Sequence, residues 1–314
     1  MRADNPGGNG APNPTLQRNI SPDEVSGATA EVMRGITIPT RPAVLIELHE
    51  KMLSPDASIK DISRIVGSDV GLAGAVLKTA NSPWFGLKSK SNSVNGAVSL
   101  LGMTNVSSIC TQIMLRASLE GAQDVSLERF WDSATDIATI SRGLVDRMGE
   151  AYGDDAYTLG LFHDCGIPLL MRKFTDYREV LKIANDSKYK TCAQVEDERY
   201  GTNHATVGYF VCKSWYLPHD ICEAVLNHHN PEIWGKDANL KHKIKSMIGV
   251  VQMAEDISHA FRAGQIHLNH LQRHDQTYYE WKNIKLDVFE HFSLSENAYH
   301  ELHADMMEQL QENA

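Results

Sequence analysis

The chain has 314 residues, of which 42% are hydrophobic, enough for one large core or two modest ones. Its 40 acidic and 30 basic residues give a formal net charge of -10, which argues against a nucleic-acid-binding surface, because such surfaces are basic. No apolar run reaches the roughly 18 residues of a membrane span, so no contact with a membrane is expected. The five cysteines show no CxxC spacing and lie in apolar helical patterns, which predicts reduced thiols and a cytoplasmic location.

Hydrophobic periodicity predicts helices along almost the whole chain. Residues 1–20, rich in Gly, Pro and Asn, are expected to be a disordered arm without a secretory leader. A capping box at Ser21 opens a helix that ends near Gly35, and an extended loop over 36–42 follows. We assign residues 21–125 to an N-terminal helical lobe, whose further helices are expected around 44–53, 58–66, 72–80, 93–101 and 104–119.

A second group of helices is predicted after a polar turn at 121–126. It comprises a long helix over 127–148, followed by helices at about 155–173, 176–186, 191–200, 203–215, 219–229 and 240–261. We assign residues 126–265 to this second lobe and 266–314 to a C-terminal tail, with two helices around a turn at 293–295. No segment of five or more residues shows convincing alternation of period two, so the sequence predicts an all-α fold.

The pair His163-Asp164 stands in an apolar stretch, GLFHDCGIPLL, where buried charge needs a reason. Imidazole and carboxylate groups that meet at one centre can hold one or two divalent ions, which lower the pKa of a bound water and neutralise a phosphate. Each histidine taken alone is more often a capping or core-edge residue bonded to a backbone carbonyl. The candidate ligands are His163, Asp164, His204, His228, His229 and Asp256.

The order His-Asp, His, His-His, Asp resembles the HD superfamily of metal-dependent phosphohydrolases. More specifically, residues 36–232 resemble the HDOD domain family, most clearly in the NSPWFG turn at 81–86 and in the helix that ends at Leu101-Gly102. The resemblance implies an all-helical, bilobed domain, in which an N-terminal lobe stands beside an HD-like lobe. It also implies an output or scaffold module of bacterial signalling, of a kind in which many members have lost hydrolase activity.

Three departures from the hydrolases bear on catalysis. Ser133 stands where active relatives carry a histidine, and its neutral hydroxyl is a poor metal ligand, although Asp132 or Asp136 could substitute for it. Ile167 occupies the position of a lysine that serves phosphate in hydrolytic relatives. No Gly-Tyr-Pro signature follows His229, which argues against a cyclic di-GMP phosphodiesterase.

The sequence therefore favours a regulatory protein of bacterial signal transduction that binds other signalling proteins and lacks hydrolase activity. The alternative is an HD-type metal-dependent phosphohydrolase acting on a phosphomonoester, a phosphodiester or a nucleotide, with Asp164 as its catalytic residue. The cofactor is either none or a divalent metal (Mn, Mg, Ni, Fe or Zn) in a centre that is a remnant of a hydrolase site. Trp84 and Phe85, in the NSPWFG turn, are a candidate contact for a partner, although anchoring the turn to the core is the commoner role of such a pair. The oligomeric state stays open.

Overall fold

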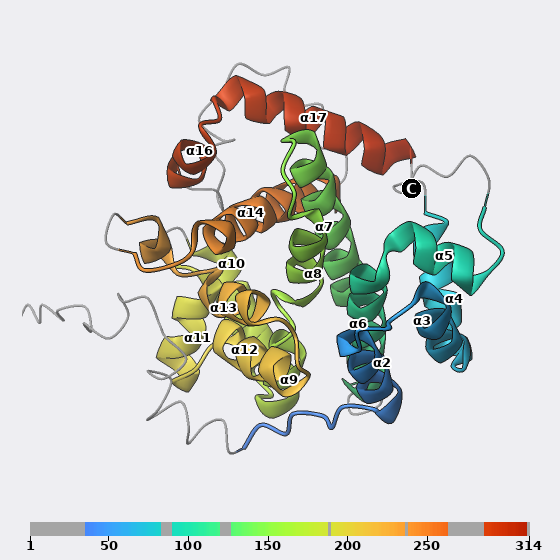
Figure 1. Ribbon diagram of the computed structural model, residues 1–314. Helices are drawn as coiled ribbons and strands as arrows, with labels where there is room; N and C mark the ends of the chain where they lie inside the picture. Colours follow the sequence, from blue (N-terminus) through green and yellow to red (C-terminus); the bar gives the residue numbers. More distant parts are fainter. Residues whose placement is uncertain are drawn as a thin grey trace, which may run out of the picture.

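The computed structural model describes residues 35–82, 90–119, 127–187, 190–235, 238–262 and 286–312. Within these ranges the regular elements are helices and none is a strand, which confirms the predicted all-α fold (Figure 1). The predicted arm at 1–20, the helix predicted from Ser21 and the Trp84-Phe85 pair lie outside the described residues.

The N-terminal helices begin and end at the signals that the sequence carries. Ser58 accepts a hydrogen bond from the main-chain N–H of Asp61, and Ser93 caps its helix in the same way. Gly102 adopts a φ of 80°, which a side chain disfavours, and the chain bends there by 111° between two consecutive helices. This group, at the right of Figure 1, comprises α2 (Ala43–Leu53), α3 (Ile59–Gly67), α4 (Val70–Ala80), α5 (Val94–Leu101) and α6 (Met103–Leu119).

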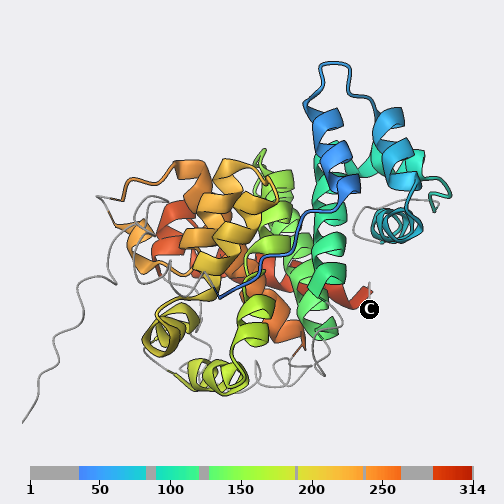
Figure 2. The ribbon, with the colours of Figure 1, turned by 90° about the horizontal axis from the view of Figure 1, so that it is seen from below.

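The second group surrounds α7, which packs along α8 and α14 in the middle of the molecule (Figure 1). A pair of helices, α12 and α13, lies against α8 and α9, and α10 packs on α11 (Figure 2). The elements are α7 (Glu128–Arg147), α8 (Gly153–Phe162), α9 (Ile167–Lys173), α10 (Tyr177–Asp186), α11 (Cys192–Tyr200), α12 (His204–Ser214), α13 (His219–Asn227), the short 3-10 helix η3 (Pro231–Trp234) and α14 (His242–Arg262).

The single helix predicted over 155–173 is wrong, because the chain turns between α8 and α9 at residues 163–166. A Cβ on Gly166 would collide with the carbonyl oxygen of His204 and lie 2.8 Å from the nitrogen of Gly208, so the turn touches the backbone of α12. Pro168 then stands in the first turn of α9, where a missing N–H costs nothing. The turn is therefore fixed by contact with α12.

The C-terminal tail forms two helices, α16 (Leu286–Phe292) and α17 (Glu296–Glu312), as predicted. Helix α17 lies across α7 and α14 (Figure 1). Tyr299 is fully buried there, and its hydroxyl donates to the Asp256 carboxylate at 3.2 Å. Arg147 on α7 pairs with Asp305, 3.6 Å away on α17. The tail is therefore packed into the same core as α14.

The segment before α2 joins the two groups of helices. It is extended, as predicted, and the indole of the buried Trp215 donates from Nε1 to the carbonyl of Pro39 at 2.9 Å. Across the described ranges, no single helix is long and apolar enough to span a membrane. Helices α5 and α6 reach that length and composition only when taken together, across a bend of 111°.

Candidate metal centre

The turn between α8 and α9 brings Asp164 against the ends of two other helices. Its Oδ1 lies 3.2 Å from Nε2 of His204, the first residue of α12, and 3.4 Å from Nε2 of His228, which follows α13. Its Oδ2 lies 3.4 Å from Nε2 of His163. The His229 ring stands 4.1 Å from the His228 ring and 4.9 Å from the His204 ring, centroid to centroid. Five of the six predicted ligands therefore meet at one place.

The three buried histidines of this centre are held by their Nδ1 atoms. His163 and His228 donate from Nδ1 to backbone carbonyls three residues earlier, at 2.9 and 2.7 Å. His204 donates from Nδ1 to the Glu196 carboxylate at 2.6 Å. Because these acceptors carry no proton to give, each Nδ1 is the protonated ring nitrogen. The three Nε2 atoms are thereby turned toward Asp164, as in histidines that bind metals.

The sixth predicted ligand, Asp256, does not join this cluster, because its carboxylate accepts from Tyr299 on α17. Its neighbour Glu255 faces the centre instead, with Oε1 3.4 Å from Nε2 of His163. Consecutive residues of a helix point about 100° apart, so only one of the two carboxylates can face the histidines. Glu255 is not among the predicted ligands, since the rotation of α14 about its axis is not visible in the sequence.

Glu196, on α11, is a second residue that the predicted set lacks. It is completely buried, and its Oε2 accepts both from the ring and from the main-chain N–H of His204, the latter at 2.8 Å. The hydroxyl of Tyr177 donates to its Oε1. The surrounding sequence, CAQVEDERYG, has the polar composition of an exposed helix, so no signal there marks Glu196 as buried.

Opposite charges dominate the electrostatics of the centre. Burial by itself would lower the pKa of His163 and of His204, but the carboxylates beside them raise both values well above 6.5. Burial would likewise raise the pKa of Asp164, yet His163 and His204 hold it well below 3.8. His229 differs, because burial and the neighbouring His228 lower its pKa well below 6.5. The Asp164 carboxylate is therefore ionised and needs a cation beside it, either protons on the imidazoles or a metal ion.

The donor atoms fit a divalent metal ion. Two buried atoms of the centre, Nε2 of His163 and Oδ1 of Asp164, have no hydrogen-bond partner among the described residues. Ligand atoms within 4.8 Å of one another form two groups that share Asp164. One group adds His204, His228 and His229, and the other adds His163 and Glu255. Imidazole and carboxylate together suit Mn, Fe, Ni and Zn.

No lysine or arginine among the described residues forms an ion pair with the carboxylates of the centre. The ion pairs of its carboxylates, as far as the structure describes the chain, are all with histidines. Ile167, in the place of the phosphate-binding lysine, packs against the hydrophobic core. Asp136, a possible substitute for the histidine missing at Ser133, is ion-paired with Arg262 on α14.

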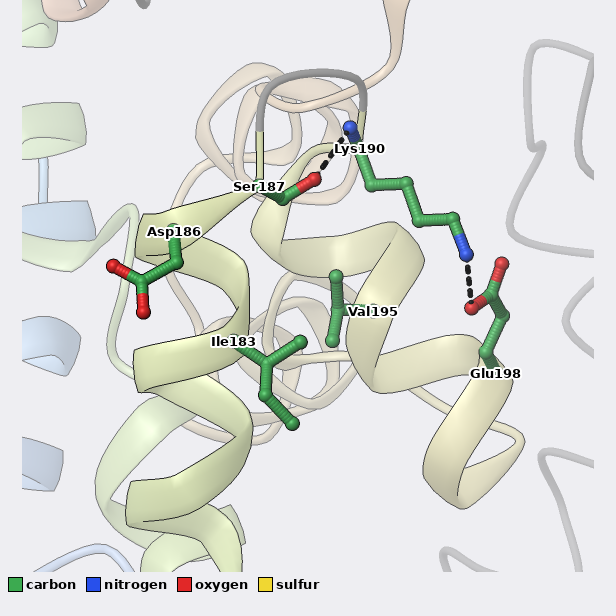
Figure 3. Close-up of a pocket in the computed structure, with 6 residues that line it drawn as sticks. All are labelled: Ile183, Asp186, Ser187, Lys190, Val195 and Glu198. Atoms are coloured by element: carbon green, nitrogen blue, oxygen red, sulfur yellow. Dashed lines mark hydrogen bonds and ion pairs between the residues drawn. The ribbon is translucent and has the colours of Figure 1, made fainter.

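A hollow of about 420 Å³ lies elsewhere, between α10 and α11 (Figure 3). Ile183 and Val195 face each other across it, and Lys190 reaches over to the Glu198 carboxylate at 2.6 Å (Figure 3). Its lining contains none of the predicted ligands: Ile183, Asp186, Ser187, Lys190, Val195 and Glu198.

An all-α fold with histidines and an aspartate gathered where a His-Asp turn meets two helix ends defines an HD-type helical domain. The chain belongs to the HDOD domain family, which matches it over residues 38–231. An uncharacterized protein of Treponema pallidum (strain Nichols) is 24% identical over 231 residues, which cover 69% of this chain and 44% of that relative. The chain thus spans less than half the length of this curated relative.

Solved structures share the fold. An HDOD domain protein of unknown function from Geobacter sulfurreducens has a TM-score of 0.60 at 21% identity, covering 90% of this chain and 97% of its own. A protein from Marinobacter aquaeolei VT8, provisionally named a signal transduction protein, has a TM-score of 0.64 at 18% identity, covering 91% and 64%. A protein from Shewanella amazonensis SB2B, provisionally named a phosphohydrolase, has a TM-score of 0.59 at 19% identity, covering 91% and 98%.

Proposed function

We propose that this protein is a cytoplasmic HDOD regulator that binds other signalling proteins and holds a divalent metal ion at the Asp164 centre without hydrolysing phosphoesters. The observation that carries this proposal is the charge of the centre. Its carboxylates are matched by imidazoles, and no lysine or arginine among the described residues pairs with them. Phosphoryl chemistry needs positive groups aimed at the phosphate oxygens, and beside the metal ion and the imidazoles no lysine or arginine described at this centre supplies one. The name of the Marinobacter relative and the five free thiols agree with a cytoplasmic signalling role.

Asp164, His204, His228 and His229 are the residues that would hold the ion, and His163 and Glu255 form a second group of ligand atoms that shares Asp164. When bound, it would supply the positive charge that joins the α8–α9 turn to the ends of α12 and α13. Of the expected metals, Mg is the least suited, since it prefers oxygen ligands and keeps its waters. The Nδ1 hydrogen bonds of His163, His204 and His228 fix the orientation of the imidazole rings without a bound ion.

A second candidate function is the phosphohydrolase, with Asp164 as its catalytic residue. Oδ1 of Asp164 favours it, because this atom accepts no hydrogen bond from the described residues and an HD hydrolase needs a carboxylate oxygen that can hold a metal. The provisional name of the Shewanella relative points the same way.

One experiment separates the two functions. The purified chain is reconstituted with Mn, Ni, Fe or Zn, analysed for bound metal, and assayed on phosphomonoester, phosphodiester and nucleotide substrates. We expect bound metal, a lower melting temperature after chelation, and no turnover. Asp164→Ala should lose the metal, whereas the control Asp220→Asn, which breaks only a surface pair with Lys241, should keep it. Turnover that disappears in Asp164→Ala would establish the hydrolase instead, and a chain that takes up no metal would refute the metal centre.

The protein-binding part of the proposal has its own test. Partners captured from native lysate by the parent chain are compared with those captured by the double variant Trp84→Ala, Phe85→Ala. We expect the double variant to lose partners. An unchanged set would show that the NSPWFG turn is not the contact.

A further inference from the structure

Three buried histidines of the metal centre differ in what holds them. His163 and His228 donate from Nδ1 to neutral backbone carbonyls of their own helices. His204 donates to Glu196, a carboxylate from a different helix. Among these three rings, His204 is therefore the one whose Nδ1 partner carries a full negative charge.

Glu196 holds His204 at two points. Its Oε2 accepts from the ring Nδ1 at 2.6 Å and from the main-chain N–H at 2.8 Å. The same atom thus fixes the backbone at the start of α12 and the rotation of the ring that the helix presents. Charge-assisted hydrogen bonds of this kind are roughly twice as strong as neutral ones.

Tyr177 fixes Glu196 in turn. Its hydroxyl, at the start of α10, donates to Oε1, the carboxylate oxygen that His204 does not use. Both side chains are buried, Tyr177 with 1% and Glu196 with 0% of its surface exposed. The α10–α11 pair thus carries a line of hydrogen bonds from Tyr177 through Glu196 to His204, and the Nε2 of His204 faces Asp164.

We propose that Glu196 is a positioning residue that orients His204 and strengthens it as a metal ligand, and that Tyr177 holds Glu196 for this role. The inference rests on the proposed metal binding at Asp164. A negative partner on Nδ1 pushes electron density toward Nε2, which makes the ring a better donor to a cation. The carbonyl partners of His163 and His228 do this less, so His204 becomes the strongest imidazole ligand of the set.

The test measures the affinity of the full chain for Mn²⁺ alone, by calorimetry at one fixed pH. Glu196→Gln keeps the shape and an oxygen for the Nδ1 hydrogen bond but removes the charge. We expect it to weaken binding by about 10–100-fold, the usual loss when such a partner is removed. Tyr177→Phe removes one hydroxyl and should weaken binding less, by several-fold. It also carries the test if Glu196→Gln does not fold.

The control is Asp197→Asn, the next residue on α11. Its carboxylate accepts from the Asn203 side chain at 2.9 Å, and it acts on His204 through charge alone, with no hydrogen bond or ion pair to that ring described. We expect its Mn²⁺ affinity to fall far less than that of Glu196→Gln, even if its melting temperature falls.

The outcomes are distinct. If both Glu196→Gln and Tyr177→Phe lower the melting temperature but bind Mn²⁺ as the parent does, Glu196 is only structural, and this inference is wrong while metal binding stands. If Asp197→Asn loses as much affinity as Glu196→Gln, the effect is a general loosening of α11, and the inference is also wrong. If the parent chain itself binds no Mn²⁺, both the proposed centre and the inference fall.

Discussion

Asp256→Asn is expected to stabilise the protein at neutral pH and to leave metal binding unchanged. Burial raises the pKa of Asp256 to about 6 from its ordinary 3.8, with a smaller contribution from Glu255, despite the hydrogen bond from Tyr299. Between these two values the folded chain holds a proton that the unfolded chain has released. The carboxyl therefore makes the fold less stable as the pH rises from about 4 to about 6, and the penalty persists above that range.

The size of the penalty follows from the shift. About 2 pKa units correspond to about 3 kcal/mol at neutral pH, which is an upper limit because the side chain keeps some contact with solvent. Asparagine is neutral at every pH and still offers an oxygen to Tyr299. We therefore expect the variant to be more stable than the parent by about 1–3 kcal/mol near pH 8, and this advantage should shrink by about 1 kcal/mol near pH 5.

Urea denaturation of the chelator-treated protein at both pH values measures this difference. Glu255→Gln is the matched variant, since it neutralises the adjacent carboxylate that faces His163. It should weaken metal binding, whereas Asp256→Asn should not. Parallel pH dependence in parent and Asp256→Asn would refute the raised pKa of Asp256. A loss of metal as large as that in Glu255→Gln would refute its assignment to the contact with α17.

Two further predictions concern contacts between distant parts of the chain. Gly166→Ala should lower the stability of the fold by about 1–3 kcal/mol or more and weaken metal binding, because its Cβ would strike the carbonyl of His204. The control Gly67→Ala has open space around its Cβ, so its stability should be unchanged or rise by up to about 1 kcal/mol. Thermal denaturation of both variants checks this, and a fully stable Gly166→Ala would disprove the close approach. Trp215→Phe should lower the stability of the fold by about 1–3 kcal/mol, since it leaves the carbonyl of Pro39 without its hydrogen bond. A melting temperature equal to that of the parent would show that this hydrogen bond contributes nothing to stability.

Most helices could be predicted because their signals are local. Ser58, Ser93 and Gly102 act on main-chain groups within one helical turn of themselves, so the helix ends they form can be predicted from the neighbouring residues. The helix predicted over 155–173 failed for the opposite reason. Its apolar pattern continues across the break, and the break is made by contact between Gly166 and a backbone about 40 residues further along the chain.

The candidate site, like the helices, was predictable from the sequence only in part. The types and order of His163, Asp164, His204, His228 and His229 are visible in the sequence, and the structure gathers them at one place. The choice of Glu255 over Asp256 depends on how α14 is rotated about its axis, which its packing against α7 and α17 decides. That rotation has no local signature.

The candidate ligand types and most helix boundaries can thus be predicted from this chain, because residue type and short-range hydrogen bonds decide them. Which atoms meet is decided by how closely distant helices approach. A Cβ on Gly160 would lie 2.5 Å from the Cα of Ala138, so the backbones of α8 and α7 are in close contact. This contact positions His163, which follows α8, at the centre. Glu196 becomes a partner of His204 only because α11 packs against the start of α12. Such contacts join residues that are far apart in the chain or on different helices, and close packing of the core selects them.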